Sequence, residues 1–187
     1  MAFTFTVETG AGSSSSNAYC SVAEADDYHA ASVSNAVWTA LTTDQKQAAL
    51  AMATRVLDAS FRFNGYRRLT TQALQWPRIS ARNPDEYAGA YLGGAVSTLS
   101  AGYWPDDTVP KPVKDATAEL ARLLTVSDRT AEADGVGLKR VDIFEAIEIE
   151  FDGSGRNTVP NYVAELLRGV GSFVSGKGVS AARIERA

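Results

Sequence analysis

The chain is poor in the residues that most often carry chemistry. Its 187 residues include one cysteine, Cys20, and one histidine, His29. A lone cysteine forms no disulfide within the chain, and a lone histidine without further imidazole or thiolate ligands is not typical of a zinc site. No second base is available to activate a nucleophile, and the G-x-S-x-G pattern does not occur. We therefore expect no enzyme, no metal site and no cofactor, with Cys20 buried as a small apolar residue.

Basic charge and long apolar runs are also scarce. Lysine and arginine total 18 against 22 acidic residues, which gives a net charge of −4. This balance argues against a protein whose main task is nucleic-acid binding, because phosphates are neutralised by Lys and Arg, although a local basic patch stays open. No window reaches the roughly 18 to 20 apolar residues of a membrane span, and the N-terminus lacks the basic region of a signal peptide. We expect synthesis in a reducing cytoplasm and no membrane partner.

Capping boxes and apolar periodicity predict four helices. Ser21 and Glu24 have the spacing at which each residue caps the other's backbone, and Thr42 and Gln45 repeat it. Pro112 suits the first turn of a later helix, where its missing N–H costs nothing. The segment 9–17, rich in Ser and Gly, is expected to be a flexible connector. The predicted helices span residues 22–32, 42–63, 109–124 and 159–168.

The expected fold is mainly α, a small bundle of about four helices with three additions. Alternating apolar residues predict a β-hairpin over 138–152. The stretch 79–107 is too long for a simple connection in a compact domain and is predicted to be a long irregular loop, either a functional excursion or a loop that binds a partner. Residues 1–173 would form one domain, followed by a flexible C-terminal arm over 174–187. The candidate interface residues of the long loop are Tyr87, Tyr91, Tyr103 and Trp104.

The stretch "GSFVSGKGVS", residues 171–180, nearly matches the phosphate-binding P-loop. Gly178 replaces the Ser or Thr that would hold magnesium, and a predicted helix precedes the loop where a strand is needed. The glycines are better interpreted as the end of the last helix and as hinges of the arm. The arm residues expected to contact a partner are Lys177, Val179, Arg183, Ile184 and Arg186.

The stretch "FRFNGYRR", residues 61–68, combines aromatic residues with three arginines. Aromatic stacking together with phosphate contacts is typical of single-stranded nucleic-acid binding. The plainer alternative is a helix end at which arginine stems lie over a core aromatic residue. Trp76 is expected to be a core or interface residue.

Four blocks of the sequence, taken in order, resemble a known family. They are "TVETGAGSSSSNAYCSVAEADDYHAA", "WTALTTDQKQAALAMATRVLD", "QALQWPR" and "VPKPVKDATAELARLL". Together they are similar to the head–tail connector (adaptor) proteins of tailed bacteriophages, a family sometimes labelled DnaT-like. None of these blocks is a catalytic motif. The long loop over 79–107 exceeds what this family usually carries, and Cys20 replaces a common apolar residue.

The resemblance implies a structural protein of the virion at the head–tail junction, or neck. Such adaptors have a helical-bundle fold and form a ring, commonly of about twelve copies, that extends the DNA channel beneath the portal. The implied partners are further copies of the chain, the portal protein, a head-completion or tail-terminator protein, and passing double-stranded DNA. An acidic lining would let DNA slide, and the candidate lining residues are Glu145, Glu148, Glu150 and Asp152. A single-stranded DNA-binding module is the alternative.

Overall fold

A computed structural model describes residues 3–85, 102–130, 140–143, 147–150 and 158–174. Within these ranges the chain forms five helices and six short antiparallel strands, a mixed α/β arrangement instead of the expected mainly α bundle. The helices are α1 (Val22–Ala30), α2 (Ala36–Thr39), α3 (Thr43–Ser60), α4 (Lys111–Val126) and α5 (Asn161–Leu166). The strands are β1 (Phe61–Phe63), β2 (Tyr66–Arg67), β3 (Arg78–Ile79), β4 (Arg140–Ile143), β5 (Ile147–Glu150) and β6 (Gly171–Phe173).

Both predicted capping boxes are confirmed. The Ser21 hydroxyl accepts the Glu24 amide at 3.2 Å, and the Glu24 carboxylate accepts the Ser21 amide at 2.7 Å. Thr42 and Gln45 make the same reciprocal pair at the start of α3. Each box satisfies donors that a helix N-terminus otherwise leaves unpaired, which explains why α1 and α3 begin where the sequence predicts.

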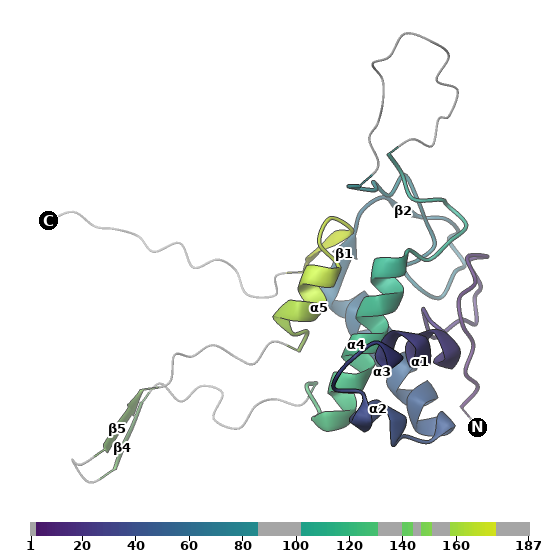
Figure 1. Ribbon diagram of the computed structural model, residues 1–187. Helices are drawn as coiled ribbons and strands as arrows, with labels where there is room; N and C mark the ends of the chain where they lie inside the picture. The colour runs from purple at the N-terminus through teal and green to yellow at the C-terminus, as the bar shows by residue number, and fades with distance from the viewer. Residues whose placement is uncertain (1–2, 86–101, 131–139, 144–146, 151–157, 175–187) are drawn as a thin grey trace, which may run out of the picture.

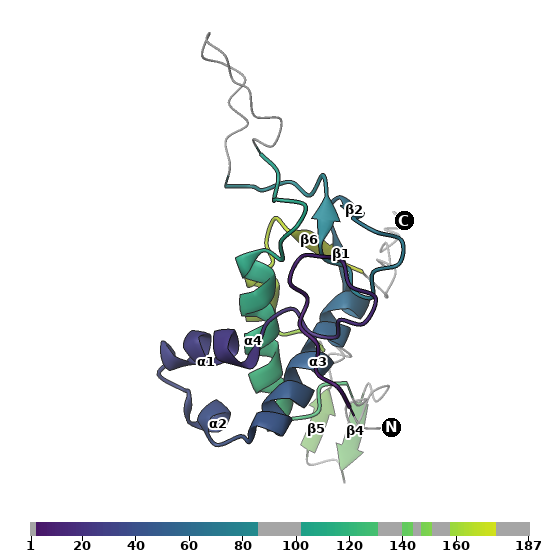
Figure 2. The same ribbon diagram turned by 90° about the vertical axis from the view of Figure 1, so that its right-hand side faces the viewer.

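The core lies where α3 and α4 pack against each other, with α1 and α5 also packing on α4 (Figure 1, Figure 2). Leucine and valine residues at helical spacing line the facing sides of α3 and α4. The side chains of Trp38 and Trp76 are also fully buried. Each large apolar side chain removed from water contributes about 1.5–3 kcal/mol. The buried core extends in sequence from Ala18 to Val170.

The N-terminal loop is folded around a carboxylate and does not behave as the expected flexible connector. Glu8 is 2% exposed, and its carboxylate accepts the backbone N–H groups of Gly10, Gly12 and Ser13 at 2.8 to 3.0 Å. Gly10 has φ +103°, and a side chain there would collide with the carbonyl oxygen of Asp107. The small residues of this loop therefore allow close backbone packing around one buried charge.

Strands β1 and β6 pair two segments that the sequence predicts to be the ends of helices. The sequence predicts a helix to residue 63, but α3 ends at Ser60 with Phe61 as its C-cap, and Phe61 begins a strand in which it pairs with Phe173. Gly171 begins β6 instead of acting as a helix stop, since α5 already ends at Leu166. A side chain at Gly171 would lie 2.6 Å from the carbonyl oxygen of Arg62, so the two strands approach closely at this position.

The long loop has an ordered base. Strand β2 pairs with β3, with Tyr66 opposite Ile79. Further along, Arg82 forms an antiparallel bridge with Tyr103, and the Trp104 amide donates to the Ala81 carbonyl at 2.8 Å. The two ends of the predicted loop are therefore hydrogen-bonded to each other, whereas residues 86–101 lie outside the described ranges.

The predicted hairpin is present as β4 and β5. Its register pairs Val141 with Ile149 and Ile143 with Ile147, so apolar residues are opposite apolar ones. The alternation of apolar and charged residues that predicts the two strands also explains their register. A shift of the pairing by one residue would place apolar residues opposite charged ones.

One buried hydroxyl connects three distant parts of the chain. Tyr19 is fully buried, and its O–H donates to the Asp58 carboxylate on α3. The same phenolic oxygen accepts the backbone N–H groups of Gln75 and Trp76 at 3.1 and 3.3 Å. The other Asp58 carboxylate oxygen accepts the Gln75 amide at 3.1 Å. The "QALQWPR" block is thus attached to α3 through Tyr19.

We expect Tyr19→Phe to lower the free energy of unfolding by about 1–3 kcal/mol, because it removes the acceptor of the Gln75 and Trp76 amides and one of the two donors to Asp58. Urea denaturation followed by tryptophan fluorescence measures the change. Tyr66→Phe is the matched control, since Tyr66 is 73% exposed. Equal stability of the two variants would contradict the role given to the Tyr19 hydroxyl.

Candidate nucleic-acid interface

The two ladders at the base of the long loop carry a cluster of exposed cationic and aromatic side chains. Tyr66, on β2, is 73% exposed. Tyr103, which forms the antiparallel bridge with Arg82, is 45% exposed. Ile79, the partner of Tyr66, lies three residues before Arg82, the partner of Tyr103. Three residues of extended chain span about 10 Å at most, so the two pairs are no further apart than that along the chain. We call this cluster the arginine–tyrosine surface, and its members are Tyr66, Arg67, Arg68, Arg82 and Tyr103.

The charges of the arginines of this surface are not paired within the described residues. None of them forms an ion pair with a carboxylate of the described residues. Among the described residues, the guanidinium groups of Arg67 and Arg68 each make one hydrogen bond to a backbone carbonyl, at 3.4 and 2.9 Å. Between Asp58 and Asp85 the sequence contains five arginines and no acidic residue, which is unusual in a chain of net charge −4. A local positive potential is the result.

The predicted cluster over 61–68 divides into two sets in the structure. Phe61 and Phe63 are each 4% exposed and belong to the core, so the plainer interpretation is right for these rings. Arg62, Tyr66 and the arginines after it are exposed, as a nucleic-acid site needs. The chain here is a strand and a turn, not a helix end. Arg78 is the exception among the arginines, because its guanidinium donates to backbone carbonyls inside the fold.

Tyr103 and Arg82 were not connected by sequence reasoning. The bridge joins residues that are 21 positions apart, and no local pattern predicts such a pairing. The absence of acidic residues between Asp58 and Asp85 was a signal that could have widened the candidate site to include Arg82.

The other interface residues predicted from the sequence lie partly within the described ranges of the chain and partly outside them. Trp104 is partly buried and packs against the core. Glu148 and Glu150 lie on β5, opposite Asp142 and Arg140. These interface and lining assignments remain predictions. Outside the described residues lie Tyr87, Tyr91, Glu145, Asp152, Lys177, Val179, Arg183, Ile184 and Arg186.

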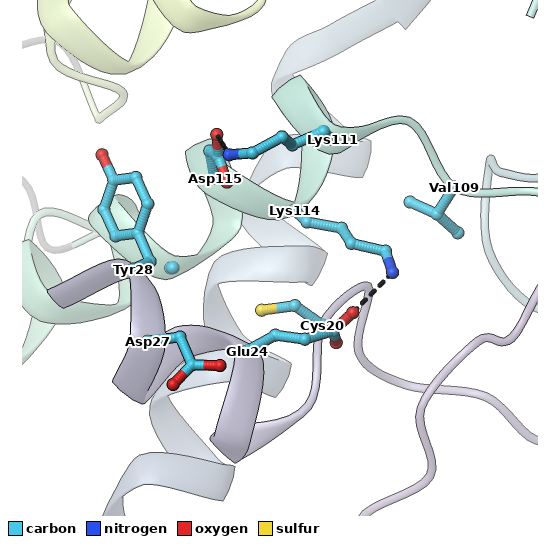
Figure 3. A pocket seen from close by; sticks show the side chains of 9 residues that line it. Cys20, Glu24, Asp27, Tyr28, Val109, Lys111, Lys114 and Asp115 are labelled. Atoms are coloured by element: carbon cyan, nitrogen blue, oxygen red, sulfur yellow. Dashed lines mark hydrogen bonds and ion pairs between the residues drawn. The ribbon is translucent and has the colours of Figure 1, made fainter. Parts of the chain in front are cut away.

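A second location with several charged groups is the pocket between α1 and the start of α4, shown in Figure 3. Its charges are largely paired, because Lys114 contacts Glu24 at 2.6 Å and Lys111 contacts Asp115. Burial raises the pKa of the Cys20 thiol to about 12, so the thiolate is not formed at neutral pH. This agrees with the prediction of a packed, unreactive Cys20.

His29 is a structural residue at the centre of the α1–α2–α4 corner. It is fully buried, and its Nε2 lies 3.0 Å from the carbonyl oxygen of Ala118. The ring contacts Trp38 with centroids 4.8 Å apart. Within the part of the chain that the structure describes, its Nδ1 has no partner. Burial lowers the pKa of His29, which keeps the ring neutral near pH 7.

Two negative findings apply to the described ranges. Residues 3–85, 102–130, 140–143, 147–150 and 158–174 contain no group of three or more His, Cys, Asp or Glu that could hold a metal ion. In the same ranges, no helix has the length and apolar character that crossing a membrane requires.

The N-terminal half of the chain can be compared with known proteins. A family model matches residues 3–92. The family is described as "Putative DnaT-like ssDNA binding protein". The match includes Tyr66, Arg67, Arg68 and Arg82 but ends before Tyr103. No curated protein and no solved structure matches the chain.

We expect acidification to destabilise the fold through His29. The folded chain keeps the ring neutral, whereas the unfolded chain binds a proton below its ordinary pKa of about 6.5, so the free energy of unfolding falls as pH drops below 6.5. The slope from this group reaches at most about 1.4 kcal/mol per pH unit. His29→Gln can still donate to Ala118 and does not titrate, so the wild type should lose stability relative to it.

Denaturation of both proteins from pH 7.5 to 5 provides the measurement. Asp58 acts in the opposite direction, because burial raises its pKa to about 6 and its contribution is lost as pH rises through that value. Since both proteins contain Asp58, the difference between the two curves isolates His29. A difference that stays constant with pH would show that His29 does not titrate differently in the two states.

Proposed function

We propose that this protein binds single-stranded nucleic acid through the arginine–tyrosine surface. The observation that carries the proposal is the combination of two exposed tyrosines with three exposed arginines that have no ion-pair partner among the described residues. Arginines neutralise the phosphates, and the tyrosine rings offer faces on which unpaired bases stack. The description of the matching family supports the same ligand.

The overall negative charge of the chain limits how many phosphates it can bind. The chain has a net charge of −4, so a polyanion is repelled by much of the molecule and attracted by local groups of arginines such as this surface. Binding would therefore use few phosphates and depend on stacking for much of its free energy. A duplex hides its base faces, and it should bind more weakly than a single strand of equal length.

Fluorescence anisotropy with a labelled oligothymidylate tests this proposal. We expect Tyr66→Leu and Tyr103→Leu each to weaken binding by about tenfold, since stacking contributes roughly 1–3 kcal/mol per base. Arg67→Gln and Arg82→Gln should each lower the slope of log K against log salt by about 0.7, the contribution of one phosphate on a single strand.

The matched control is Arg55→Gln, which removes an exposed arginine of α3 that forms no ion pair with described residues. It should leave affinity and salt slope unchanged. No measurable binding of the wild type at low salt would overturn the proposal, and equal effects of Arg55→Gln and Arg67→Gln would remove the site.

A structural protein of the phage neck is the second candidate function that we propose. The sequence resemblance favours it, as do exposed apolar side chains next to the C-terminal segment, with Tyr162 58% and Val174 56% exposed. Burial of such side chains between subunits would stabilise a ring of identical copies. The portal protein would bind on one side of the ring and a head-completion or tail-terminator protein on the other, with double-stranded DNA passing through.

Light scattering of the protein alone and mixed with a portal protein tests this second candidate. We expect a ring-sized oligomer in at least the mixed sample, visible as a ring by electron microscopy. Val174→Asp should reduce assembly and change the thermal stability of the monomer little, because the Val174 side chain is 56% exposed. A monomer under both conditions would exclude the ring.

A further inference from the structure

A pocket lies beside strands β1 and β6, outside the arginine–tyrosine surface. Its volume is about 600 Å³, within the range of sites for small molecules. In Figure 2 these strands lie next to β2, which carries Tyr66 and Arg67. Arg67 is paired with Arg78, and Arg78 lines the pocket, so the pocket is adjacent to the proposed path of the nucleic acid. The lining residues that carry the argument are Asp58, Arg62, Gln75, Arg78 and Phe173.

One wall of the pocket is an aromatic ring that is incompletely covered. Phe173 packs on Phe61 with ring centroids 4.3 Å apart, yet it remains 46% exposed. The part of the ring that faces the pocket is available for stacking. A planar base is a ligand that can cover it, since base–aromatic stacking does not require a particular hydrogen-bonding pattern.

The pocket is also lined by an acceptor, Asp58, and by side chains that carry donors, Gln75 and Arg62. The Asp58 carboxylate accepts from Tyr19 and from the Gln75 amide, one bond on each oxygen, and the lone pairs of each oxygen can accept a second hydrogen bond. The Gln75 side-chain oxygen accepts from Arg78 at 3.1 Å. That bond fixes the orientation of the amide, whose Nε2 has no partner among the described residues. Arg62 is exposed and forms no ion pair within the same ranges.

We propose that this pocket binds one unstacked guanine of the single strand. Guanine presents two adjacent donors, N1–H and N2–H, next to the acceptor O6. Asp58 would accept the two donors, the Gln75 Nε2–H would donate to O6, the ring would stack on Phe173, and Arg62 would contact the phosphate. Thymine and uracil have a single ring N–H and no exocyclic amino group, so they satisfy Asp58 less well. This assignment rests on the proposed binding of single strands and adds a base preference to it.

The first experiment compares three labelled oligonucleotides that differ at one position of an oligothymidylate. We expect guanine at the central position to strengthen binding about tenfold over thymine, within the range of one well-matched base contact. Hypoxanthine lacks the 2-amino group, and it should lose about fivefold relative to guanine. Equal affinity for the three oligonucleotides would overturn the guanine assignment.

The second experiment tests the residues. Phe173→Leu should abolish the preference for guanine, and Phe173→Tyr should keep it, because a ring is retained. Phe3→Leu is the matched control, since Phe3 is 57% exposed and far from the pocket in sequence. Gln75→Glu replaces the donor to O6 with an acceptor and should also remove the preference. Thermal unfolding of each variant identifies any that fails to fold.

The pH dependence adds a readout that a purely structural role would not change. Burial raises the pKa of Asp58 to about 6, so its carboxylate becomes protonated between pH 7.5 and 5 and no longer accepts two donors. We expect the guanine preference over thymine to fall across this interval, while the affinity for the all-thymine strand changes less.

The outcomes separate the two proposals. If the wild type binds no single strand at all, the proposed function fails and the guanine pocket with it. If the wild type binds oligothymidylate but shows no base preference, or if Phe173→Leu behaves like Phe3→Leu, the pocket assignment is wrong and binding at the arginine–tyrosine surface stands.

Discussion

The hydrogen bonds of one buried tyrosine connect α3 with the segment that leads to β3, and the rest of the structure depends on this connection. Tyr19 donates to Asp58 of α3 and accepts from the backbone of Gln75 and Trp76. The segment that follows contains β3 and the inward-facing Arg78, whose guanidinium in turn binds the carbonyls of the turn before β2. The backbone that carries Arg67 and Arg68 is therefore held by interactions inside the fold, which lowers the backbone entropy that ligand binding would cost.

Buried carboxylates organise the irregular regions of this fold in two places. Glu8 accepts three backbone N–H groups of the N-terminal loop, and Asp58 accepts from Tyr19 and Gln75. In both cases a segment without regular secondary structure gains defined positions for its donors. The segment 9–17, which composition predicts to be a flexible connector, is thus one whose backbone donors are partly satisfied by a buried carboxylate.

The sequence predicted the features that depend on local spacing and missed those that depend on distant pairing. The capping residues Ser21 and Thr42 gave the correct starts of α1 and α3, and alternation gave the register of β4 with β5. The pairing of β1 with β6 joins residues more than 100 positions apart, and nothing near Phe61 or Gly171 indicates it. Of the candidate site, Arg67 and Arg68 lie in the stretch for which the sequence left nucleic-acid binding and a helix end as alternatives, whereas Arg82 and the pocket beside Phe173 required the tertiary structure.

Cys20 gives the chain a property that its burial alone does not suggest. It is the only thiol in the sequence, it is 1% exposed, and its pKa lies well above neutral pH. Reagents that modify thiolates should therefore ignore the folded protein and react only when the α1–α4 corner opens. The rate of modification then reports that opening directly. For the same reason, a cysteine introduced on the surface would be the single site of dye attachment, without prior removal of the native one.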